Sequence, residues 1–223
     1  MEPLTPNTLQ GTWSTILLPL DKSENINWGG IESQLNAFAE AKVNGIYFNG
    51  TAGEFFSQTD EEFLRLATTV ADFCHKRNIA FQIGATHPQA TDTLKRVKET
   101  HHLSPGAFQV ILPEWSPLSW EELRGFLERV IAAAHPIPIV IYNPPYAQKI
   151  LQPEEWSEIA TAFPALIGIK VAGGDATWHK AMHEAAEKLS VFVAGIRLAS
   201  GIIKGCARGS YSNLACLSPK GAV

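Results

Sequence analysis

Short apolar runs alternate with longer amphipathic stretches along the whole chain. Runs rich in β-branched and aromatic residues predict eight strands, at residues 12–18, 45–49, 79–84, 107–112, 138–142, 166–171, 191–194 and 209–214. Most of these runs are continuously apolar rather than alternating, which is typical of parallel strands covered on both faces.

Seven stretches between these runs carry the spacing of amphipathic helices. In residues 28–42, Ile31, Leu35, Phe38 and Ala39 follow the i, i+4, i+7, i+8 pattern of one helix face. The other predicted helices span residues 60–77, 88–102, 119–134, 153–162, 175–188 and about 197–205.

Repeated strand–helix units fold either as an open doubly wound sheet or as a closed barrel. Eight strands favour an α/β fold of the (β/α)8 TIM-barrel type, which begins at roughly 200 residues. No linker, low-complexity tract or repeat interrupts the chain, so the sequence predicts a single domain over residues 1–223. In such barrels the chemistry lies at the C-terminal ends of the strands.

Composition narrows the class of protein. The chain is 45% hydrophobic and 18% charged, with a net charge of -4 and no block of Lys and Arg, so neither a nucleic acid nor a membrane partner is expected. The three cysteines form no C-x-x-C pair, which predicts a reducing compartment rather than a disulfide framework or zinc site. With no basic signal sequence and no apolar run of roughly 18 residues, we expect a cytoplasmic protein.

Lys170 is a charged residue near the end of the apolar run at 166–171. Burial disfavours the ammonium form and lowers the pKa of a lysine, and the resulting free amine can attack a carbonyl to form an imine. A structural ion pair or an outward-pointing lysine is the alternative interpretation. The position at the end of a strand favours the chemical role.

Two further features lie at neighbouring strand ends. Tyr142 ends the fifth predicted strand and is followed by Asn143-Pro144-Pro145, which must leave the sheet. A phenol beside an amine can move a proton at a carbinolamine, although an ordinary core tyrosine would look the same. The loop at 50–54 (GTAGE) has two glycines and the hydroxyl of Thr51, and predicts either a simple βα turn or a nest for a carboxylate or phosphate.

Three motifs together, GTAGE at 50–54, YNPP at 142–145 and GIKVAGGD at 168–175, resemble the dihydrodipicolinate synthase/N-acetylneuraminate lyase family of class I aldolases. The resemblance runs from Gly11 to Gly209 and implies a Schiff-base enzyme. By this resemblance Lys170 is the imine-forming lysine, Tyr142 carries protons, and Thr51 contributes to catalysis. The implied substrate-binding residues are Thr51, the backbone N–H of Ala52, Gly195 and Tyr211.

The resemblance implies a lyase, aldolase or dehydratase acting on pyruvate or a longer 2-oxo acid such as a keto-deoxy sugar acid. The Lys170 amine attacks the ketone, and the protonated imine serves as the electron sink for making or breaking a bond. No metal and no organic cofactor is expected. A homo-oligomer is expected.

Several positions depart from the family pattern. Dihydrodipicolinate synthases carry a second threonine, a second tyrosine contributed across a dimer interface, and an arginine, where this chain has Ala52, Trp115 and Ala147. Sialic acid lyases carry acidic residues where this chain has Ile196 and Arg197. These differences argue against both named reactions, and the loop is more similar to branches that split or dehydrate keto-deoxy sugar acids. Arg197 either binds a distal carboxylate or is a surface arginine at a helix start.

The C-terminus also departs from the pattern. Family members continue past the eighth strand with a closing helix and further helices, whereas this sequence stops at Val223. We therefore expect a barrel that lacks these helices, truncated after the eighth strand, with exposed apolar surface on one flank. Either the chain is a shortened form or a partner subunit covers the gap.

Other polar groups have less specific interpretations. His179 and His183 stand four residues apart, a spacing that can bind a metal, but a solvated helix face is the preferred interpretation. Lys95 and Arg96 are expected on a helix surface. Besides the Schiff-base enzyme, a dihydrodipicolinate synthase proper, an inactive family member that binds a ligand, and an unrelated barrel that binds phosphate at the GTAGE loop remain as alternatives.

Overall fold

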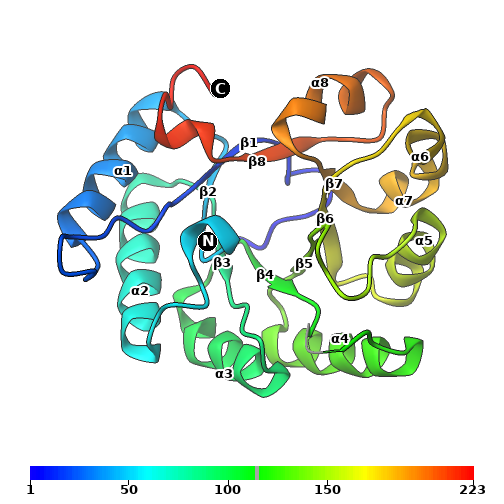
Figure 1. Cartoon of the computed structure of the whole chain (residues 1–223), viewed down its shortest axis with the longest axis horizontal. Coiled ribbons are helices and arrows are strands. Elements are labelled where there is room, and N and C mark those ends of the chain that lie inside the picture. Colours follow the sequence, from blue (N-terminus) through cyan, green and yellow to red (C-terminus); the bar gives the residue numbers. More distant parts are fainter. Residues whose placement is uncertain (114–115) are drawn as a thin grey trace.

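A closed barrel of eight parallel strands forms the centre of the molecule. The computed structural model describes residues 1–113 and 116–223, and the strands follow one another around the barrel in chain order. Figure 1 shows this ring of strands end-on. The strands are β1 (Gly11–Thr15), β2 (Gly45–Phe48), β3 (Phe81–Gly84), β4 (Ala107–Ile111), β5 (Ile139–Asn143), β6 (Leu166–Val171), β7 (Ser190–Phe192) and β8 (Gly209–Ser212).

Helices form the outer ring around these strands (Figure 1). They are α1 (Trp28–Ala41), α2 (Asp60–Arg77), α3 (Ala90–Thr100), α4 (Trp120–Ala134), α5 (Pro153–Ala162), α6 (Ala176–Ala181), α7 (His183–Lys188) and α8 (Gly195–Ile203). Short 3-10 turns lie at η1 (Thr51–Gly53), η2 (His101–Leu103) and η3 (Leu214–Cys216). The predicted TIM-barrel class is confirmed.

Local sequence signals explain where several helices begin. The Thr59 side chain accepts from the Glu62 backbone N–H while the Glu62 carboxylate accepts from the Thr59 N–H, which closes a capping box at α2. Ser119 and Glu122 do the same at α4. These boxes satisfy N–H groups that a helix leaves without partners, so they fix the start of each helix.

Two predicted elements differ from the structure by more than two residues at an end or in being divided. The first strand ends at Thr15 rather than at residue 18, because the Leu17 N–H donates to the Gln34 side chain on α1, 3.1 Å away, instead of to a neighbouring strand. The single helix predicted at 175–188 is two helices that meet at Met182, where ψ of -10° departs from the helical value. Met182 is fully buried against the barrel.

The molecule has two separate hydrophobic cores. The outer core lies between strands and helices and contains, for example, Phe38, Phe63, Phe126, Trp156 and Ile169. The inner core lies inside the barrel and consists of Leu9, Trp13, Tyr47, Ala107, Val140, Ile167, Phe192 and Tyr211. Tyrosine is therefore found only in the inner of these two clusters of buried residues, among those that the structure describes.

The N-terminal segment closes one end of the barrel. The Leu4 N–H donates to the Gly106 carbonyl at the start of β4, 2.8 Å away, and Leu9 is fully buried in the inner core. The Ser190 hydroxyl, at the start of β7, donates to the Leu9 carbonyl. Because these contacts occupy the N-terminal ends of the strands, access to the barrel interior is left to the opposite end.

The seam between β8 and β1 differs from the rest of the outer ring. After β8 the described chain contains the 3-10 turn η3, and its C-terminal segment lies between α1 and α8 (Figure 1, red). Ile196, Ile203, Leu214 and Leu217 are exposed on α8 and after β8. Among the helices of the described residues, none is both long and apolar enough to cross a membrane.

Candidate functional site at the C-terminal end of the barrel

Lys170 lies near the end of β6, with Tyr142 of β5 directly beside it in the strand register and Phe192 of β7 on its other side. Its Nζ atom is 3.9 Å from the centroid of the Tyr142 ring. The rings of Tyr211 and Tyr47 follow at 5.3 and 5.5 Å. The predicted pair of Lys170 and Tyr142 is therefore in direct contact.

The surroundings of the Lys170 amine change its protonation. Among the residues that the structure describes, no carboxylate forms an ion pair with this amine. Burial lowers the pKa of Lys170 from 10.5 to about 8. The electron-rich faces of the rings offset part of this cost, since they attract a cation. A substantial fraction of the amine is therefore neutral, and nucleophilic, at mildly alkaline pH.

All four tyrosines of the chain gather at this site. Burial raises the pKa of Tyr47 well above its usual value, and the nearby phenols of Tyr211, Tyr142 and Tyr146 raise it further. Burial likewise raises the pKa of Tyr211, although its hydrogen bond to Gln82 opposes this effect. Tyr47 and Tyr211 therefore keep their phenol protons at physiological pH.

The floor of the site is a small polar group inside the barrel. The Tyr211 hydroxyl donates to Gln82 Oε1 at 2.8 Å, and Gln109 Nε2 approaches the same oxygen at 3.4 Å. Gln82 and Gln109 are fully buried on β3 and β4. This bond fixes the hydroxyl end of the Tyr211 side chain, whose ring centroid is 5.3 Å from Lys170 Nζ.

The GTAGE loop forms the tight turn η1 after β2. Asn49 and Glu54 flank it with left-handed backbone conformations, φ 58° and 52°. The Gln58 side chain donates to Asn49 Oδ1 at 2.8 Å and to the Gly53 carbonyl at 3.1 Å. These two hydrogen bonds hold the loop in place. A side chain at Gly50 would come within 2.7 Å of the Tyr47 ring, so glycine is required there.

A hydrogen bond joins the GTAGE loop to the loop after β5. Thr51 Oγ1 and the Tyr146 hydroxyl are 2.7 Å apart. The 3-10 bonds of η1 begin at the Gly53 N–H, so the backbone N–H groups of Thr51 and Ala52 lie outside the bonds of that turn. Ala52 is exposed at this rim.

The remaining predicted positions lie at the same end of the barrel but farther around its rim. Gly195 is exposed and begins α8 directly after β7, and a Cβ atom at this position would lie 3.7 Å from the Ser210 hydroxyl. Arg197 Nη1 donates to the Gly174 carbonyl at 2.7 Å, which joins α8 to the loop after β6. Trp115 lies outside the described residues.

Two polar residues expected on the surface are buried, so those predictions are wrong. Arg96 is 2% exposed, donates to the Thr86 carbonyl at 2.6 Å and contacts the Phe55 carbonyl at 3.4 Å. Its long side chain reaches inward from α3 and joins two loops near the site. His179 is 6% exposed and its Nδ1 lies 2.8 Å from Cys206 Sγ, while His183 lies on a different helix.

Sequence reasoning missed four site residues. Tyr47 precedes the GTAGE loop and faces inward, which the alternation of inward and outward residues along β2 could have indicated. Gln82 and Gln109 are polar residues within apolar runs, the same signal that singled out Lys170. The contact of Tyr146 with Thr51 has no signal in sequence spacing, because the two residues are 95 positions apart.

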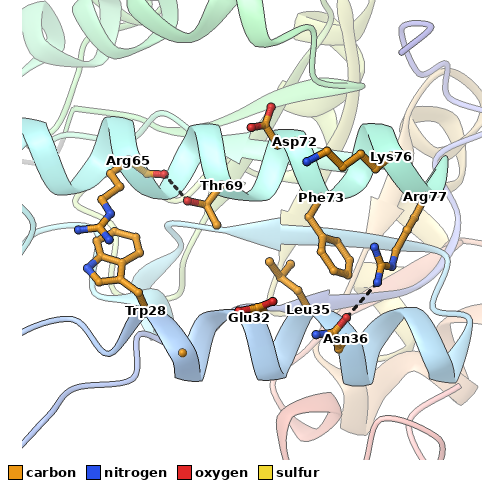
Figure 2. A pocket seen from close by; sticks show the side chains of 11 residues that line it. Trp28, Glu32, Leu35, Asn36, Arg65, Thr69, Asp72, Phe73, Lys76 and Arg77 are labelled. Atoms are coloured by element: carbon orange, nitrogen blue, oxygen red, sulfur yellow. Dashed lines mark hydrogen bonds between the residues drawn. The ribbon is translucent and has the colours of Figure 1, made fainter.

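A separate groove of about 540 Å³ lies on the outer surface between α1 and α2 (Figure 2). Arg65 stacks over the Trp28 ring at 3.9 Å, and Arg77 bonds to Asn36 at 3.1 Å. Both arginines of this groove are thus held by residues of its own walls. It lies on helix surfaces rather than at the strand ends where Lys170 is found.

The fold and site define a (β/α)8-barrel protein with an amine of lowered pKa among tyrosines at the end where barrels carry chemistry. The model of the dihydrodipicolinate synthetase family matches residues 8–214, so the chain belongs to this family.

Curated relatives cover most of the chain at low identity. N-acetylneuraminate lyase 2 of Escherichia coli O6:H1 is 24% identical over 168 residues, which is 74% of this chain and 54% of that protein. An uncharacterised DapA-like lyase of Thermococcus kodakarensis is 24% identical over 162 residues, or 73% of this chain and 54% of that protein. The chain thus spans about half the length of these relatives.

Solved structures show the same fold. YagE from E. coli K12, a prophage protein of the dihydrodipicolinic acid synthase family in complex with pyruvate, matches with a TM-score of 0.88 at 20% identity, over 96% of this chain and 73% of that one. CdNal from Clostridium difficile, in complex with mannosamine, matches with a TM-score of 0.87 at 20% identity and the same coverage.

Proposed function

We propose that this chain is a Schiff-base lyase or aldolase that acts on a 2-oxo acid such as pyruvate, with Lys170 as the nucleophile. The observation that carries the proposal is the Lys170 amine itself, with a pKa of about 8 and its Nζ 3.9 Å from the Tyr142 ring centroid. An ordinary lysine stays protonated until pH is above 10, and an ammonium cannot attack a carbonyl. Membership of the dihydrodipicolinate synthetase family supports the same chemistry.

The reaction begins when the neutral Lys170 amine attacks the ketone carbon of the 2-oxo acid. The carbinolamine then loses water to give a protonated imine. When the bond between carbons 3 and 4 of the substrate breaks, its electron pair forms the C2=C3 double bond of an enamine, and the C=N pair moves onto the nitrogen. Tyr142, beside the amine, takes and returns the protons of these steps. Tyr47 and Tyr211, which hold their protons, serve as hydrogen-bond donors or packing surfaces.

The substrate carboxylate is proposed to bind at the GTAGE loop. The Thr51 hydroxyl and the N–H of Ala52 lie at the same rim as Lys170, and Gly195 and Tyr211 complete the proposed substrate contacts. Among 2-oxo acids we favour keto-deoxy sugar acids other than sialic acid. Ala52 and Ala147 replace a threonine and an arginine of the dihydrodipicolinate synthase pattern, and Ile196 and Arg197 stand where sialic acid lyases carry acidic residues.

We also propose a cytoplasmic homo-oligomer. The thiols of Cys74, Cys206 and Cys216 are free, which fits a reducing compartment. The exposed isoleucines and leucines on α8 and after β8 would be shielded in an oligomer. Sedimentation of the purified chain tests whether it forms an oligomer, and a monomer at micromolar concentration would contradict the proposed oligomer.

Trapping of the imine tests the proposed function. Borohydride added in the presence of pyruvate reduces an imine to a stable secondary amine, which intact mass and peptide mapping locate. We expect one adduct on Lys170, its loss in Lys170→Ala, and its retention in Lys180→Ala, which removes an exposed lysine of α6. A protein without an adduct, with pyruvate or with keto-deoxy sugar acids, would refute the proposal in favour of an inactive, ligand-binding barrel.

A further inference from the structure

The loop between β5 and α5 is tied across its base by one buried side chain. Asn143 Nδ2 donates to the Lys149 carbonyl at 2.8 Å, and Asn143 Oδ1 accepts from the Leu151 N–H at 2.9 Å. Within the loop, the Ala147 N–H donates to the Pro144 carbonyl at 3.0 Å and closes a turn around Tyr146. Since Asn143 is 4% exposed, these bonds are shielded from water and the loop is held in one shape.

The tip of this loop reaches the GTAGE loop through its tyrosine. The Tyr146 hydroxyl is 2.7 Å from Thr51 Oγ1, although 56% of the Tyr146 residue is exposed. An exposed tyrosine usually turns its hydroxyl to water and its ring to the protein. Tyr146 instead uses its hydroxyl for a contact with a site residue.

The chemistry of the two hydroxyls favours one direction for this hydrogen bond. A phenol, with an ordinary pKa near 10, is a much stronger acid than an alcohol and is therefore the better donor. If Tyr146 donates to Thr51 Oγ1, the Thr51 proton remains available for a further acceptor. Donation to the oxygen also polarises the Thr51 O–H bond and strengthens the hydrogen bond that it gives onward.

We propose that Tyr146 is a substrate-positioning residue that acts through Thr51, orienting the Thr51 hydroxyl toward the carboxylate of the bound 2-oxo acid. This inference rests on the proposed function, in which Thr51 contacts that carboxylate. The loop after β5 thereby links the proton-carrying residue Tyr142, which precedes it directly, to the carboxylate end of the substrate.

The test is the pyruvate dependence of borohydride trapping in Tyr146→Phe, which removes the hydroxyl and keeps the ring. We expect the half-saturating pyruvate concentration to rise about three- to tenfold, the loss expected for one hydrogen bond, while the rate at saturation changes less than about twofold. Gln148→Ala, at an exposed position of the same loop, serves as the matched control and should behave as the wild type.

Combination with Thr51 variants shows whether Tyr146 acts through that residue. Thr51→Val removes the hydroxyl, so adding Tyr146→Phe should cause no further loss, whereas Thr51→Ser keeps the hydroxyl and should stay sensitive to Tyr146→Phe. A half-saturating pyruvate concentration that is unchanged in Tyr146→Phe would overturn the positioning role alone. A further rise when Tyr146→Phe is added to Thr51→Val would do the same. A wild-type protein that forms no adduct on Lys170 would instead overturn the proposed function and this inference with it.

Discussion

The outer and inner cores of the barrel differ in composition and in the polar side chains that lie beside them. The outer core, between strands and helices, is built mainly from aliphatic and phenylalanine side chains, and Trp156 is the one tryptophan among its buried residues that the structure describes. The inner core holds Trp13 and two tyrosines, Tyr47 and Tyr211, and lies beside the buried amides of Gln82 and Gln109. Gln82 Nε2 and Gln109 Oε1 find no hydrogen-bond partner within the described residues.

The difference indicates a division of labour. Apolar burial in the outer core supplies the stability of the fold, because each large side chain removed from water contributes roughly 1.5–3 kcal/mol. The inner core gives up part of that stability, since a buried amine and buried amide atoms without a hydrogen-bond partner among the described residues, one in each of Gln82 and Gln109, are costly. In return it provides the lowered pKa of Lys170 and the tyrosines that surround it. Substitutions at the site of the inner core should therefore lower the reaction rate more than the stability, and substitutions in the outer core should lower the stability more than the rate.

The largest effect is expected for Tyr142→Phe, on the rate of the reaction at Lys170. Loss of the group that moves the proton should slow the exchange of pyruvate methyl protons for deuterium about 10²- to 10⁴-fold. The free energy of unfolding, measured in urea, should change by less than about 1 kcal/mol, as for most changes of a single polar group. Proton NMR in D2O measures the exchange, and a rate equal to that of the wild type would show that Tyr142 does not carry the proton.

In the outer core, the large effect is expected on the free energy of unfolding rather than on the reaction rate. Phe38 is fully buried on α1, so Phe38→Ala should lower the free energy of unfolding by about 3–5 kcal/mol. Phe38→Leu, which leaves a smaller cavity, serves as the control and should cost much less. The folded fraction of Phe38→Ala should still form the Lys170 adduct at the normal rate. A stable Phe38→Ala variant with slow adduct formation would contradict the separation of the two cores.

Lys170→Met should make the fold more stable, by about 1–3 kcal/mol at pH 7. The pKa of Lys170 is about 8 in the folded chain and 10.5 in an ordinary lysine, so between these values the unfolded chain binds more protons. The wild type should therefore gain stability as pH rises from about 8 to 10.5, while Lys170→Met shows no such gain. Urea unfolding across this pH range measures the difference, and equal pH profiles would mean that the amine is not buried.

The smallest effect is expected at the floor of the site. Tyr211→Phe removes the donor to Gln82 Oε1 and should cost about 0.5–1.5 kcal/mol in urea unfolding, more if the glutamine finds no new partner. Tyr211→Leu, which also removes the ring, should cost more and disturb adduct formation. Equal stability of Tyr211→Phe and the wild type would indicate that this buried bond contributes nothing.

Periodicity predicted most of the fold. The strand at 166–171 and the helices at 60–77 and 153–162 have the predicted bounds, because a continuous apolar run, a capping box and a proline at the first helical turn are local signals. The division of the helix at Met182 and the burial of Arg96 and His179 were not predicted. The burial of Arg96 and His179 depends on contacts with distant residues, Phe55 for the first and Cys206 for the second.

Only part of the candidate site was predicted, because some of its contacts follow from the order of the strands and others depend on residues far apart in the sequence. Lys170 and Tyr142 end adjacent strands, so a barrel brings them together without further information. The bond between Tyr146 and Thr51 depends on the shape of the loop after β5, and the contact of Tyr211 with Gln82 depends on the register across the barrel. The roles of Thr51, Ala52, Gly195 and Tyr211 in substrate binding remain predictions.

The pH dependence of adduct formation tests the central claim most directly. Borohydride trapping with saturating pyruvate, followed by peptide mapping, reports both the residue modified and the rate at each pH. Because only the neutral amine attacks the ketone, the rate of adduct formation on Lys170 should rise with pH and level off above a midpoint near 8. An adduct spread over surface lysines, or a rate that still rises beyond pH 10, would contradict the account of Lys170 as a buried nucleophile.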